Sequence, residues 1–159
     1  MFRRQKSSAK QDQSVCQQWE YYLMKGNEYY FRSQYQTAAY CYSIAADYLE
    51  VIVDSESQAK CCEECADGRC FQHYFIACQN TSHAFAMSGD LTKAEQYLSR
   101  AHYKFLALVT ESVKGTLSWQ ENMRSICERS LDTLVQFLER HDRQGTATSV
   151  MMESRRLLH

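Results

Sequence analysis

The sequence predicts an all-α protein, an antiparallel stack of about five helices paired into hairpins. Its 159 residues contain no proline, the residue that most often interrupts a helix. Large apolar residues recur at steps of three and four, the spacing of one helix face, and no segment has the alternation of a strand. Residues typical of helix ends fall at 33, 67–68, 89–90 and 115, which leaves long segments between tight connections.

The first two helices are expected at about 14–32 and from 35 onward. The first carries a stripe of aromatic side chains that is interrupted by Gly26. Glycine costs about 1 kcal/mol relative to alanine inside a helix, so Gly26 indicates a neighbouring helix that packs too closely for a Cβ atom. The second helix has alanines on its inner face, which permit that approach. It either runs to Ala66 or is followed by a short helix from Glu56.

Two further helices are expected at about 69–88 and 91–114. Between them stand Gly89, in the position where glycine ends a helix, and Asp90, a residue that caps the next one. Both segments keep apolar or small residues at steps of three and four. They therefore predict a second hairpin.

A fifth helix is expected to end near His141 and to close the stack. Ser118 and Glu121 have the spacing of a capping box, in which the two side chains bind each other's backbone N–H groups. The predicted N-terminus of this helix therefore lies at Ser118.

The expected organisation is one helical domain at 14–142. Residues 1–13 are polar and basic and predict a flexible arm, with an electrostatic contact to a membrane or an acidic partner as the alternative. Residues 143–159 are expected to be a tail that forms a short docking turn or no ordered structure.

Composition argues against several classes of protein. With 18 basic and 19 acidic residues the net charge is −1, whereas nucleic-acid binding calls for a clustered basic face. No stretch approaches eighteen consecutive apolar residues, so no membrane span is expected. Polar residues follow Arg3 and Arg4 where a signal peptide needs an apolar segment, which predicts a cytoplasmic protein.

An internal repeat relates two parts of the chain. In the first hairpin the repeated positions are Gly26, Tyr29, Tyr35, Ala38, Tyr42 and Ala45. The residues 56 positions later are Ser82, Phe85, Leu91, Ala94, Leu98 and Ala101. On these residues the chain resembles the tetratricopeptide repeat family. That family's period is about 34 residues, and its closing proline is absent here, so the resemblance implies extended helices and an irregular superhelix.

The resemblance also implies a concave groove, lined by the first helix of each hairpin, that binds a peptide or protein segment. The implied groove residues are Glu20, Leu23, Asn27, Tyr30 and Phe31, followed by Ile76, Gln79, His83, Ala86 and Met87. Asn27 matches the asparagine with which the family binds a peptide backbone or terminal carboxylate. The lysines that complete that clamp are replaced by Leu23 and Gln79, so an apolar partner segment is expected. In the competing interpretation, Tyr30 and Phe31 simply pack against the linking helix.

Eight cysteines are many for this length. Four potential ligands, Cys61, Cys65, Cys70 and His73, are spaced so that two adjacent helices could bring them to one tetrahedral zinc ion. Cysteine also packs as a small buried residue, and a redox switch is a third interpretation. We expect packing, reduced thiols and no cofactor, with zinc as the alternative.

No phosphate-binding loop, nucleophile elbow or HExxH motif is found, which argues against an enzyme. His83, His102 and His141 are interpreted as surface or hydrogen-bonded core groups.

The resemblance, together with the lack of these catalytic motifs, predicts a non-enzymatic protein–protein interaction function, as an adaptor or regulator. The alternatives are a secretion-type chaperone for an unfolded substrate and a zinc- or redox-responsive regulator. A homodimer through exposed ends of the stack is a further expectation, because two repeats are few for an independent superhelix.

Overall fold

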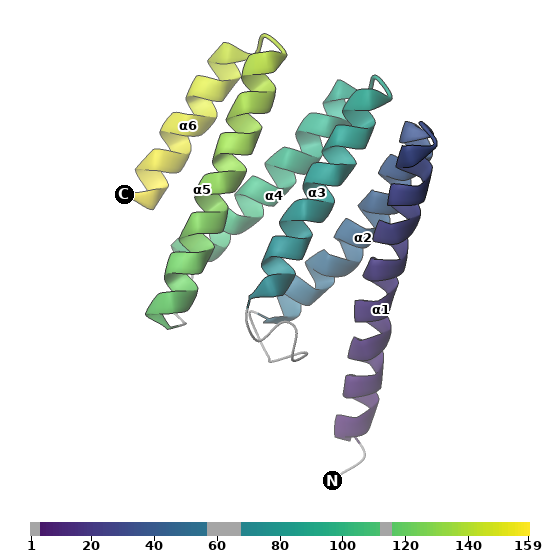
Figure 1. Cartoon of the computed structure of the whole chain (residues 1–159). Helices are drawn as coiled ribbons and strands as arrows, with labels where there is room; N and C mark the ends of the chain where they lie inside the picture. Colours follow the sequence, from purple (N-terminus) through teal and green to yellow (C-terminus); the bar gives the residue numbers. More distant parts are fainter. Residues whose placement is uncertain (1–3, 57–67, 112–115) are drawn as a thin grey trace. The chain divides into compact units, whose positions relative to one another are not determined.

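The computed structural model describes the backbone of residues 4–56, 68–111 and 116–159, with side chains from residue 17 and up to residue 54 in the first range. These residues form six helices (Figure 1): α1 (Arg4–Phe31), α2 (Tyr35–Glu56), α3 (Arg69–Met87), α4 (Leu91–Glu111), α5 (Leu117–Arg140) and α6 (Gln144–Leu158). No strand occurs within the described ranges, so the predicted all-α class is confirmed.

The chain divides into two compact units, whereas the sequence predicted one domain at 14–142. The first unit is Met1–Asp90 and holds α1, α2 and α3; the second is Leu91–His159 and holds α4, α5 and α6. Inside each unit, helices that follow one another along the chain run antiparallel (Figure 1).

In the first unit, α2 packs against both α1 and α3. Gly26 of α1 lies against Tyr42 of α2, and a Cβ atom built on Gly26 would clash with atoms Cδ1 and Cε1 of the Tyr42 ring. Ala38 and Ala45 of α2 are fully buried. The interpretation of Gly26 as a packing glycine is therefore confirmed.

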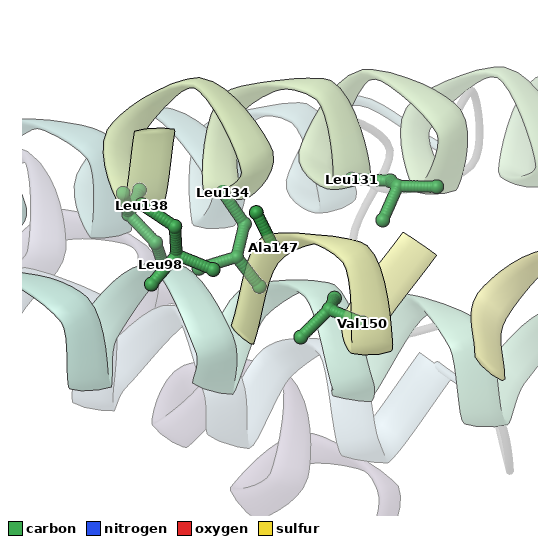
Figure 2. Close-up of a cluster of buried hydrophobic side chains, with 6 residues drawn as sticks. All are labelled: Leu98, Leu131, Leu134, Leu138, Ala147 and Val150. Carbon is green, nitrogen blue, oxygen red and sulfur yellow. The ribbon is translucent and has the colours of Figure 1, made fainter. Parts of the chain in front are cut away.

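In the second unit, α4, α5 and α6 enclose an apolar cluster (Figure 2). Its members are Leu98 of α4, Leu131, Leu134 and Leu138 of α5, and Ala147 and Val150 of α6. The structure differs here from the predicted tail, because residues 144–158 form a docked helix. Its first turns are rich in Gly, Thr and Ser, which are poor helix formers. The helix is stabilised instead by burying Ala147, Val150 and Leu158 against its neighbours.

The turns that join α1 to α2, α3 to α4, and α5 to α6 share one geometry. Each has a residue with positive φ: Ser33 at 58°, Gly89 at 89° and Asp142 at 58°. The next residue donates its N–H to the carbonyl five positions back, at 3.0 Å for Gln34 and Tyr29, 2.9 Å for Asp90 and Phe85, and 2.8 Å for Arg143 and Leu138. This is the Schellman motif, and it confirms the predicted helix end at Gly89.

These turns reveal a third copy of the repeat that the sequence comparison missed. Ala38, Ala94 and Ala147 each follow the positive-φ residue by five positions, and all three are buried. The third turn lies 53 residues after the second, whereas the second lies 56 residues after the first. A search at one fixed offset therefore could not find it.

Two helix starts differ from the prediction. Helix α1 begins at Arg4, before the expected start near Ser14, and the intervening residues include neither Gly nor Pro. Helix α5 is capped by Thr116, whose Oγ1 accepts from Trp119 N at 3.2 Å, so the predicted cap at Ser118 is wrong. The alternatives for the segment after Glu56 lie outside the described residues.

Candidate functional site

One accessible face of the first unit is formed by α1 and α3, which both run antiparallel to α2; we call it the α1–α3 face. Its two helices make side-chain contact at two levels. Tyr30 Oη lies 2.7 Å from His83 Nε2, and the rings of Trp19 and His73 stand 4.8 Å apart between centroids. The Tyr30 ring is also braced edge-on by Tyr35 at 5.1 Å. The contact between Tyr30 and His83 therefore has a defined geometry.

The α1 part of the predicted groove set lies on the accessible side of its helix. Glu20, Asn27 and Phe31 are exposed, while Leu23 and Tyr30 are half-buried. The Phe31 side chain is 87% exposed, so within the described residues it does not pack against the linking helix as the competing interpretation expected. Tyr30 does make packing contacts, but with Tyr35 and His83.

The α3 part of the predicted groove set also lies on the accessible side of its helix. Ile76, His83 and Met87 follow one another at steps of seven and four, the spacing of one helix face, and all three are exposed. Gln79 and Ala86 are half-buried. The opposite face of α3 forms the core with Tyr74 and other buried residues. All ten predicted groove residues are thus at least partly accessible.

The side chain of Asn27 is hydrogen-bonded to a residue of α2. Its Oδ1 accepts a hydrogen bond from Tyr42 Oη at 2.7 Å. Burial raises the pKa of Tyr42 to about 12, so the phenol keeps its proton at neutral pH and remains a donor. The oxygen that the resemblance assigns to a partner therefore already has a partner within the protein.

The structure describes half of the predicted zinc set. Cys70 is buried in the core of the first unit, and the His73 ring lies against Trp19. Cys61 and Cys65 lie outside the described residues. Within the described ranges, no group of three His, Cys, Asp or Glu residues is arranged to hold a metal ion.

The cysteines whose side chains are described are free thiols: Cys41, Cys70, Cys78 and Cys127. Three of them are buried, and Cys41 is half-buried. Burial raises the pKa of the Cys41 thiol and raises that of Cys127 to about 11. Both groups are therefore protonated and unreactive at neutral pH, as expected for cysteine used in packing.

The third repeat copy adds a set of positions on α5 that the sequence comparison missed. Residues 53 positions after Ile76, Gln79, His83 and Ala86 are Arg129, Asp132, Gln136 and Glu139. All four are exposed. The corresponding face of α5 is therefore charged, whereas the α1–α3 face carries exposed apolar side chains.

Across the described residues, no helix combines the length and apolar character needed to span a membrane.

No curated protein and no solved structure matches the chain. One family model, described as a protein of unknown function (DUF2753), matches residues 17–156. That range is most of the 159 residues and includes the helices α2 to α5 entirely. The chain therefore belongs to the DUF2753 family.

Proposed function

We propose that this chain is a non-enzymatic protein-interaction module that binds a segment of a partner protein on the α1–α3 face. The observation that carries the proposal is the 2.7 Å contact between Tyr30 and His83. It joins the two helices on which the predicted partner-binding residues lie, and it does so on the accessible side of the unit. Both helices are packed on α2, so their shared surface is held in place and a partner would bind without the cost of ordering it.

Large exposed apolar side chains supply the anchoring contacts. Phe31 is in the last turn of α1 and Met87 in the last turn of α3, so they lie at the same end of these parallel helices. Ile76 stands eleven residues before Met87, which is about 16 Å along a helix. Exposed apolar groups on one face are typical of protein-binding surfaces.

These dimensions favour one kind of partner segment. About 16 Å corresponds to three turns of an amphipathic helix or to five residues of an extended chain. Either segment could place one apolar side chain near Ile76 and another near Met87. Tyr30, His83 and Glu20 provide polar groups beside them, which suits a segment that is apolar on one side.

Met87→Glu tests the proposal with little risk to folding, because the Met87 side chain is 48% exposed. A buried carboxylate opposite an apolar partner is strongly unfavourable, so we expect at least about tenfold weaker partner binding, the loss typical of a central contact. The full-length protein would be used to recover partners from its source organism, with quantitative mass spectrometry as the readout. The partner identified would then be titrated against each variant.

Met152→Glu is the matched control, since Met152 is also a helical methionine, 68% exposed, but belongs to α6. It should bind the partner as the wild type does. Met87 is a better probe than Asn27 or Tyr30, because those two contact Tyr42 and His83 within the fold. Unchanged binding by Met87→Glu, with circular dichroism showing intact helices, would place the partner elsewhere.

The secretion-type chaperone is a second candidate, and the third helix–turn–helix copy at α5–α6 favours it. Chaperones of that type usually carry three regular repeats with prolines; the turn at Asp142 supplies a third copy, whereas this chain has no proline and its copies are irregularly spaced. The same recovery experiment separates the two functions. An adaptor retains one partner in its folded form, whereas a chaperone retains its substrate only while that substrate is unfolded.

A further inference from the structure

A buried histidine joins the three helices of the second unit. His102 of α4 is 0% exposed. Its Nδ1 lies 3.0 Å from Ser130 Oγ of α5, and its Nε2 lies 2.8 Å from Ser154 Oγ of α6. No buried side-chain N or O atom lacks a partner in the part of the chain that the structure describes. The interpretation of His102 as a hydrogen-bonded core group is therefore confirmed.

The directions of these hydrogen bonds define one neutral form of the ring. Ser130 Oγ donates its proton to the carbonyl of Cys127 at 2.7 Å, so it must accept from His102 Nδ1–H. The neutral ring then has no proton on Nε2, and Nε2 accepts from the Ser154 hydroxyl. A proton added to Nε2 would turn this atom from an acceptor into a donor, so Ser154 Oγ would have to accept instead and the ring would carry a buried positive charge.

The charged groups around the ring do not compensate for the positive charge that protonation would add. On α6, the Glu153 carboxylate binds Tyr103 Oη at 3.2 Å on the exposed side. On α5, the Cys127 thiol is neutral, and the charged groups near it are the exposed Glu128 and Arg124. Burial lowers the pKa of His102, and the attraction of Glu153 and the backbone of Cys127 oppose this only in part. An imidazolium here would be a buried charge whose hydrogen-bond partners are serine hydroxyls and a backbone group rather than a carboxylate.

We propose that His102 is a pH-sensitive switch. Its neutral ring holds α6 on α4 and α5 at neutral pH, and protonation of the ring releases α6. The proton comes from solvent and is added to Nε2, which can then no longer accept from Ser154 and carries a charge that is buried away from water. Release uncovers Leu98, Leu134 and Leu138 of the apolar cluster.

The direction and size of the effect follow from proton linkage. Above pH 6.5, the ordinary pKa of histidine, the ring is neutral whether α6 is docked or released. Below it, the released state takes up a proton more readily than the docked state, whose His102 pKa is lowered by burial, so acid favours release. The opening equilibrium then rises by up to about tenfold at pH 5.5.

Hydrogen exchange of the full chain at pH 7.5 and 5.5, corrected for intrinsic rates, measures this opening. We expect α6 peptides to lose about tenfold in protection at pH 5.5, while peptides of α1 and α2 keep theirs. His102→Gln should abolish the difference, because its amide can make both bonds but does not titrate. His141→Gln is the matched control, since His141 is exposed, and it should retain the tenfold difference.

If His102→Gln does not fold, ring ¹⁵N shifts of the wild-type protein decide the question. At pH 7.5 they should show His102 protonated on Nδ1 alone. Equal protection of α6 at both pH values would overturn the proposal. So would a His102 ring that is charged at pH 5.5 while α6 stays protected, because protonation would then occur without release.

Discussion

Leu134→Ala is expected to lower the free energy of unfolding of the second unit by about 2–5 kcal/mol. Leu134 is 1% exposed and belongs to the cluster shared by α4, α5 and α6 (Figure 2). Truncation removes apolar contacts with helices on two sides and leaves a cavity that cannot close without moving one of them. Urea unfolding followed by far-UV circular dichroism, together with hydrogen exchange of α5 peptides, measures the loss.

Leu117→Ala is the matched control for this prediction, because Leu117 is in the same helix but is 79% exposed. Its effect should stay within about 0.5 kcal/mol, as for most surface substitutions. Equal unfolding midpoints for the two variants would mean that the cluster does not stabilise the unit and that α6 does not dock as described.

Gly26→Ala is expected to destabilise the first unit by about 1–3 kcal/mol. In an open helix the same change would stabilise, because alanine is favoured over glycine by about 1 kcal/mol. Here the added methyl group meets the Tyr42 ring, and atom Cγ of that ring would lie only 3.0 Å from the Cβ. Tyr42 is buried and bound to Asn27, so the ring cannot move aside without further loss.

Gly145→Ala tests whether steric contact decides the sign. Gly145 is also helical, but nothing lies within 4 Å of a Cβ built on it. This variant should be as stable as the wild type or more stable by up to about 1 kcal/mol. If Gly26→Ala were also neutral or stabilising in thermal unfolding, α1 and α2 would not approach as closely as the structure shows.

Local features of the fold were predictable from the sequence because short segments determine them. Gly89 marks a helix end by its conformational freedom, and Gly26 marks a close approach because it interrupts an otherwise large-residue stripe. The structure confirms both of these predictions. The candidate binding positions on α1 and α3 were implied instead by the resemblance to the tetratricopeptide repeat family; they are at least partly accessible, and their role in binding stays a prediction.

Features that depend on distant contacts were not predictable. Helix α6 has poor intrinsic helix formers in its first turns and is stabilised by burial of Val150 and Leu158. His102 is bonded to residues 28 and 52 positions away, and Tyr30 to one 53 positions away. No spacing rule connects such pairs, because the approach of whole helices sets them.

Site-specific photocrosslinking in cells of the source organism tests the proposed binding face most directly. A benzophenone side chain would replace Phe31 on the α1–α3 face or, as the control, Leu117 on α5; both positions are highly exposed, at 87% and 79%. We predict that the probe at position 31 captures one partner protein and that the probe at position 117 does not. Capture of the same partner from position 117 alone, or equally from both positions, would contradict binding on the α1–α3 face.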